Sequence, residues 1–135
     1  MLAIAITTAP RPAPTFDQSL ASLRKAGFSE VVWVMNDGPF MNEIPACRVV
    51  QNSPPLGGLK NWAHALETLV TSSDAPWVMV LEDDIRWARG AAAALEKDLR
   101  DLDGKLRAGV GYLSLYLSRK VSKEIEYRRG RPLRP

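Results

Sequence analysis

The chain of 135 residues has the length of a single domain and is long enough to bury a hydrophobic core. Its formal net charge of +3 is unevenly placed, because residues 119–135 hold seven Lys or Arg against two Glu, whereas residues 1–118 hold eleven Lys or Arg against thirteen Asp or Glu. One Cys and one His exclude an internal disulfide and a Cys-based metal cluster, and they argue against Ser-His or Cys-His nucleophilic catalysis.

The first apolar run, residues 2–7, predicts a buried strand rather than a targeting or membrane segment. It lacks a basic flank and a cleavage site. No run in the chain approaches the roughly 18 apolar residues of a membrane span. Together with the lone Cys47, these features favour a cytoplasmic protein without a transmembrane segment.

The end of this strand and the loop after it carry Thr7, Thr8 and Arg11, and the loop contains three prolines. Prolines stiffen a loop, while two hydroxyls and one guanidinium offer donors to a nucleotide base or a diphosphate. The alternative is a rigid connection in which Thr15 only caps the following helix.

Strand and helix patterns then follow along the chain. Short apolar runs, most of them without the alternation of a half-exposed sheet, predict strands at residues 31–35, 48–51, 78–81 and 110–117. The first helical pattern carries Phe16, Leu20 and Leu23 on one face. Thr15 and Gln18 are spaced as its capping box, and Gly27 is its stop.

Two more helical patterns complete the predicted fold. The second places its apolar stripe at Leu59, Trp62, Ala63, Leu66, Leu69 and Val70, and the third at Ala91, Ala94, Leu95, Leu99 and Leu102, before Gly104. The order of elements predicts an α/β fold, a three-layer α/β/α sandwich with a mainly parallel sheet, over residues 1–118. Residues 119–135 are expected to form a basic tail, which is short and holds only Tyr127 as an aromatic residue, so nucleic acid is an unlikely partner.

Polar side chains follow three of the predicted strands. Ligands of open α/β sheets collect beyond the carboxyl ends of the strands, where the strand order reverses. Of these groups, the triplet Glu82, Asp83 and Asp84 after an apolar strand is the strongest signal. Crowded carboxylates resist ionising together unless a cation lies between them, and their hard oxygens suit Mg²⁺ or Mn²⁺ bound with a phosphate. The alternative is an ordinary acidic turn.

Three further positions carry weaker signals. Asp37 could contact a base or ribose, but an Asn-Asp-Gly turn explains it equally well. Lys60 opens a helix after a Gly-Gly turn, where it could approach a diphosphate or be a solvated side chain. His64 has no second His or Cys nearby and is interpreted as structural.

Together these landmarks resemble the nucleotide-binding half of GT-A type glycosyltransferases. They comprise the opening strand, Asn36-Asp37, the helix start at residues 57–61 and the stretch Leu81-Glu82-Asp83-Asp84-Ile85, which is similar to the Asp-x-Asp motif of that family with Glu in the first position. The resemblance spans roughly residues 2–117.

The resemblance implies a role for each matching residue. Thr7, Thr8 and Arg11 would line the nucleotide pocket, Asp37 would approach the base, Lys60 the diphosphate and Asp83 the ribose, and Asp84, with Glu82, would hold Mn²⁺ or Mg²⁺. Such enzymes usually take the acceptor site, and a catalytic base when they invert, from chain beyond the last strand seen here. We therefore expect a chain truncated at its C-terminus, or a site completed by a partner chain.

The leading hypothesis is a metal-dependent glycosyltransferase domain that moves a sugar from a nucleotide-sugar donor to the hydroxyl of an unknown glycan, lipid or protein acceptor. No residue is assigned as its catalytic base. One alternative is a non-catalytic or truncated α/β module that binds the donor or a partner. A further alternative is a nucleotidyltransferase, for which the single Arg11 after the first strand is thin support.

Overall fold

The computed structural model describes residues 2–103, and side chains up to residue 100. The chain divides into two compact units, Met1–Asp98 and Leu99–Pro135. The first unit contains all four described strands. The strand predicted at residues 110–117, the boundary predicted after residue 118 and the basic tail lie outside the described residues. In the described part of the chain, no helix is long and apolar enough to cross a membrane.

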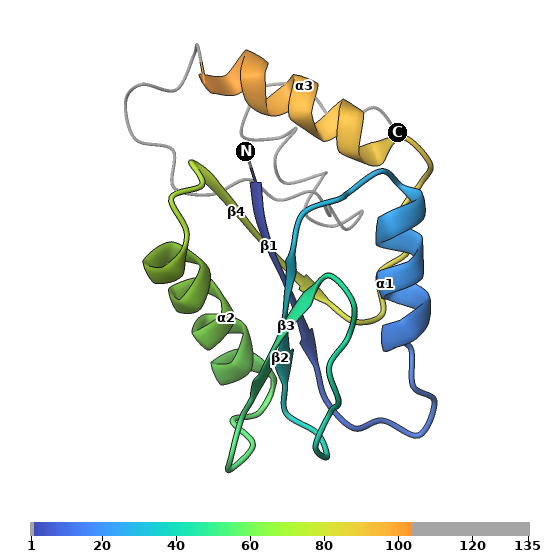
Figure 1. Ribbon diagram of the computed structural model, residues 1–135, viewed down its shortest axis with the longest axis vertical. Coiled ribbons are helices and arrows are strands. Elements are labelled where there is room, and N and C mark those ends of the chain that lie inside the picture. The colour runs from blue at the N-terminus through green and yellow to red at the C-terminus, as the bar shows by residue number, and fades with distance from the viewer. Residues whose placement is uncertain (1, 104–135) are drawn as a thin grey trace, which may run out of the picture. The chain divides into compact units, whose positions relative to one another are not determined.

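The four strands form one parallel sheet, which confirms the predicted α/β class (Figure 1). They are β1 (Leu2–Thr8), β2 (Val32–Asn36), β3 (Cys47–Gln51) and β4 (Trp77–Glu82). Their order across the sheet is β3-β2-β1-β4, and each neighbouring pair is parallel. In the register of the sheet, Thr7 of β1 lies opposite Met35 of β2 and Glu82 of β4. The polar groups that follow β1, β2 and β4 therefore leave the sheet at one edge.

Helices α1 (Phe16–Lys25) and α2 (Gly58–Ser72) lie on opposite faces of this sheet (Figure 1). Ala3 and Ala5 of β1 pack in one cluster with residues of α2. Ile4, fully buried, points to the other face, because side chains alternate along a strand. The crossover from β1 to β2 through α1 and the crossover from β3 to β4 through α2 run in opposite directions across the sheet. Right-handed connections therefore place the two helices on different faces.

The capping box predicted for α1 is wrong. Thr15 is the N-cap residue, but its side chain makes no capping hydrogen bond, and Gln18 accepts a hydrogen bond from Arg86 instead. The guanidinium of Arg86 is a charged donor, which makes it a stronger partner for Gln18 than a neutral backbone amide. The predicted stop is confirmed, because Gly27 follows the helix with φ of 104°, a conformation that favours glycine.

The apolar stripe predicted for α2 is also partly wrong. Its buried residues are Asn61, Ala65 and Leu69, whereas Leu59 is 83% exposed and Val70 is 61% exposed. Asn61 occupies a core-facing position because its side-chain amide donates a hydrogen bond of 3.0 Å to the Met35 carbonyl of β2. The prediction used apolar residues alone and so left Asn61 out. For this reason the predicted buried face differs from the face that packs on the sheet.

The third predicted helix is present as α3 (Ala91–Asp103), before Gly104. Its start lies against the end of α1, where the Ala92 amide donates a hydrogen bond of 3.2 Å to the Ala26 carbonyl. Leu95 is buried, as the apolar pattern predicts.

Two leucines of α2 test which face of this helix is buried. Leu69→Ala should lower the free energy of unfolding by about 2–5 kcal/mol, because it opens a cavity at a fully buried position. Leu59→Ala, the same change in the same helix, should shift it by no more than about 0.5 kcal/mol. Urea denaturation of both variants measures the difference, and equal losses would contradict the structure.

Candidate functional site

The point at which the strand order reverses lies between β1 and β4. The chain proceeds from β1 to β2 and β3 on one side, then returns to place β4 on the other side of β1. In open parallel sheets the crevice beyond such a point is the usual place for a ligand. Here the loop after β1 contacts the turn after β4. Thr8 and Arg11 therefore lie next to Asp83, and Arg11 also lies next to Asp84.

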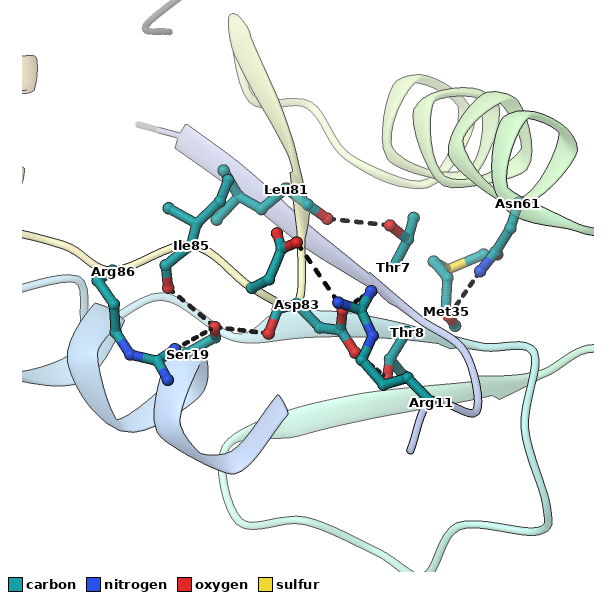
Figure 2. Close-up of polar contacts among 11 residues, drawn as sticks. Thr7, Thr8, Arg11, Ser19, Met35, Asn61, Leu81, Asp83, Ile85 and Arg86 are labelled. Carbon is teal, nitrogen blue, oxygen red and sulfur yellow. Dashed lines mark hydrogen bonds and ion pairs between the residues drawn. The ribbon is translucent and has the colours of Figure 1, made fainter. Parts of the chain in front are cut away.

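Asp83 is held by both of these residues (Figure 2). Its side chain is only 2% exposed. Thr8 Oγ1 donates a hydrogen bond of 2.6 Å to Asp83 Oδ2, and Arg11 Nη2 lies 2.6 Å from Asp83 Oδ1. No donor is aligned with Oδ1 as a hydrogen bond, so the contact with Arg11 is an ion pair. The buried charge of Asp83 is therefore balanced within the protein.

The same guanidinium reaches the next carboxylate. Arg11 Nη1 lies 3.4 Å from Asp84 Oδ2, and the Asp84 side chain is 48% exposed. Glu82, the last residue of β4, is exposed as well. Two carboxylates of the triplet, Glu82 and Asp84, are thus exposed, and Arg11 lies beside Asp84 and the buried Asp83.

Thr7 is engaged with the backbone of β4 rather than with the acidic side chains. Its Oγ1 donates a hydrogen bond of 3.2 Å to the Leu81 carbonyl. Ser19 of α1 also reaches the turn, where its hydroxyl contacts the carbonyls of Asp83 and Ile85 (Figure 2). Sequence reasoning missed Ser19, because nothing in the helical pattern distinguishes this serine from a solvated one.

Asp37 lies in a second polar cluster, between the end of β2 and the start of α2. Its carboxylate accepts hydrogen bonds from the amides of Leu56 at 3.1 Å and Gly57 at 2.7 Å. The Asn52 side chain donates a third, at 2.6 Å. Asp37 is 3% exposed, so it fastens the loop that leads into α2.

Asn52 extends this cluster into the helix. Its side-chain amide also donates to Asn61 Oδ1 at 2.9 Å, and its Oδ1 lies 3.2 Å from His64 Nδ1. His64 is therefore bound within the fold, in agreement with its structural interpretation. Lys60 is exposed at the first turn of α2. The sequence analysis missed Asn52 and Asn61 as members of this cluster, since isolated Asn residues carry no pattern.

The Asp37 carboxyl has a lowered pKa. Burial by itself raises the pKa, but the hydrogen bonds from Leu56, Asn52 and Gly57, with the nearby His64, outweigh burial and hold the pKa below 3.8. The carboxylate is thus the stable form at neutral pH.

The exposed carboxylate oxygens at this edge of the sheet are of the kind that bind magnesium or manganese. In the described part of the chain, no three acidic, His or Cys side chains converge as a complete metal site. Mg²⁺, however, usually binds one or two carboxylates and completes its shell with water and substrate phosphates. The solvent-facing carboxylates of Glu82 and Asp84 meet that requirement, whereas both oxygens of Asp83 are already engaged.

A separate hollow of about 420 Å³ lies beside β3. Phe40, Ile44 and Cys47 are among its lining residues, and none of the predicted site residues is. Burial raises the pKa of the Cys47 thiol above 9.0, although the neighbouring Arg24 opposes this shift. A thiol that stays protonated at neutral pH is a poor nucleophile, so Cys47 gives the hollow no catalytic group.

No protein-family model matches the chain, and no curated protein or solved structure matches it.

Replacing Asp37 tests its role as a fastener. Asp37→Asn should lower the free energy of unfolding at pH 7 by about 1–3 kcal/mol, because the amide can present only one oxygen to the three donors. Since the folded pKa lies below the unfolded value of about 3.9, the stabilisation is complete only above about pH 5 and is lost progressively as the pH falls through the folded pKa. Denaturation curves from pH 7 to pH 2 should therefore fall less steeply for Asp37→Asn than for the wild type. Asp74→Asn, at an exposed position, is the control and should match the wild type.

A second test removes the cation beside Asp83. Arg11→Gln should lower the free energy of unfolding by about 1–3 kcal/mol, since it leaves a buried carboxylate without its partner. Arg89→Gln, which removes an equal charge from an exposed position, should have little effect. Adding Asp83→Asn to Arg11→Gln should recover part of the loss, and a further loss would show that the two residues are not paired in solution.

Proposed function

We propose that this chain is a metal-dependent glycosyltransferase domain that binds a nucleotide-sugar donor. The observation that carries the proposal is the meeting of Arg11, Asp83 and Asp84 beyond the reversal point between β1 and β4. Ligands of open parallel sheets usually bind beyond such a point, and acidic oxygens with a guanidinium there can bind a divalent metal together with a diphosphate.

Each residue at this edge has a proposed part. Asp84 and Glu82 would hold Mn²⁺ or Mg²⁺, which stabilises the charge that develops on a nucleoside diphosphate leaving group. Arg11 and Lys60 would attract the phosphates. All these ligand roles are proposals. Contacts within the protein engage the side chains of Thr7, Thr8, Asp37 and Asp83. Arg11 and Asp84 also contact each other, at 3.4 Å, but both are partly exposed.

The acceptor side of the proposed reaction is not assigned to residues of this chain. The acceptor hydroxyl belongs to a glycan, lipid or protein, and the base that activates it is unassigned. A partner chain could complete the acceptor site. A cytoplasmic location stays a prediction from the single cysteine.

A non-catalytic donor-binding module is the second candidate. It is favoured by the balanced charge of Asp83, because an acidic turn whose buried carboxylate is already paired needs no ligand in order to be stable. Sugar transfer or donor hydrolysis by the purified chain would exclude this alternative. Transfer of a nucleotidyl group instead of a sugar would identify the nucleotidyltransferase alternative.

Donor binding is tested by thermal unfolding of the purified chain with a panel of nucleoside diphosphates and their sugars, each with Mn²⁺, Mg²⁺ or a chelator. A ligand at 100 times its dissociation constant stabilises the folded state by about 2.7 kcal/mol. One nucleotide should raise the melting temperature, and the chelator should abolish the rise.

Two matched variants localise the effect. Asp84→Asn should remove the metal-dependent rise and leave the melting temperature of the free protein nearly unchanged, since Asp84 is half exposed. Asp74→Asn, at the opposite edge of the sheet before β4, should retain the rise. If no metal and nucleotide pair stabilises the wild type, the donor site is refuted.

A further inference from the structure

One face of α1 holds the backbone that carries the acidic triplet. Ser19 Oγ lies 2.7 Å from the Asp83 carbonyl and 2.8 Å from the Ile85 carbonyl. One turn further along α1, Ser22 Oγ accepts a hydrogen bond of 3.3 Å from the Trp87 amide. The two serines therefore bind successive parts of the segment that leaves β4.

The Ser19 hydroxyl acts as both donor and acceptor. It has one hydrogen, which the two carbonyls share, and its lone pairs accept a hydrogen bond of 2.9 Å from Arg86 Nη1. Arg86 is in turn bound to Gln18 of the same helix. Ser19 is 3% exposed, so water cannot readily replace these contacts. Figure 2 shows Ser19 between Asp83, Ile85 and Arg86.

These contacts fix the backbone around Asp84, whose half-exposed side chain makes no hydrogen bond with Ser19 but lies 3.4 Å from Arg11 Nη1. Ser19 binds the carbonyls on both sides of Asp84, those of residues 83 and 85. The neighbouring Asp83 is also fixed through its side chain, by Thr8 and Arg11. With the backbone held by Ser19, the half-exposed carboxylate of Asp84 is directed toward Arg11.

We propose that Ser19 is a positioning residue, which sets the direction in which Asp84 presents its carboxylate to a metal and donor. The part of this proposal that concerns ligands rests on the proposed function. The part that concerns the turn rests only on the contacts of Ser19. Residues that orient a metal ligand without touching the metal typically change metal affinity by about 10- to 100-fold when they are replaced.

The test compares Ser19→Ala with Ser22→Ala. Both changes remove one hydroxyl from the same face of the same helix, but Ser22 contacts Trp87 rather than the acidic turn. Thermal unfolding first establishes that both variants fold. The ¹⁵N relaxation of the Asp84 and Ile85 amides is then measured without ligand. In Ser19→Ala their order parameters should fall from about 0.85 to below about 0.6, whereas Ser22→Ala should keep the wild-type values.

The second measurement titrates Mn²⁺ in the presence of the nucleotide that stabilises the wild type. Ser19→Ala should raise the dissociation constant of Mn²⁺ by about tenfold or more, and Ser22→Ala should leave it within about twofold. Equal effects of the two variants on Mn²⁺ affinity would overturn the positioning role. If the wild type binds no metal and nucleotide pair, the proposed function is refuted, and so is the part of this inference that concerns ligands. The relaxation data then decide whether Ser19 orders the turn, and unchanged order parameters would overturn that claim too.

Discussion

The buried charge of Asp83 is the constraint on which the carboxyl edge of the sheet depends. A carboxylate with only 2% of its side chain exposed is costly unless the protein supplies donors and a cation. Thr8 provides a hydroxyl from the end of β1, and Arg11 provides the cation from the following loop. The loop after β1 is thereby held against the turn after β4, at the point where the strand order reverses.

A second polar network, around Asp37, connects the end of β2 to the start of α2 at the same edge of the sheet. Asp37 binds the amides that lead into α2, and Asn61 returns from α2 to the Met35 carbonyl of β2. The two networks differ in one respect that matters for function. The polar side chains of Asp37, Asn52 and Asn61 are buried and hydrogen-bonded to one another or to the backbone, whereas the Asp83 network ends in the partly exposed Arg11 and Asp84. Only the second therefore offers charged groups to a ligand, which is why the proposed donor site is placed there.

The sequence predicted the framework well and the details of the helices less well. In the described part of the chain, four apolar runs coincide with four parallel strands. β1 and β2 are largely buried, as such runs indicate, whereas no residue of the edge strand β3 is fully buried. The capping box of α1 failed since Arg86, distant in sequence, binds Gln18. The stripe of α2 failed since Asn61 occupies a core-facing position. Both predictions were wrong because of contacts between residues far apart in the chain, which the local spacing of residues does not reveal.

By itself, the sequence determined the class of the fold, the alternation of strands and helices, and the placement of polar groups after the strands, because these follow from local apolar patterns. It also identified the acidic triplet, and the resemblance assigned Asp84 and Glu82 to a metal and Asp83 to a ribose, but nothing in the sequence distinguished the buried carboxylate from the exposed ones. The tertiary structure alone decided that Asp83 is buried and paired while Glu82 and Asp84 face solvent, and that the cation between the carboxylates is Arg11. The physical reason is that burial and charge pairing depend on which strand ends become neighbours, and only the folded sheet brings residue 11 beside residue 83.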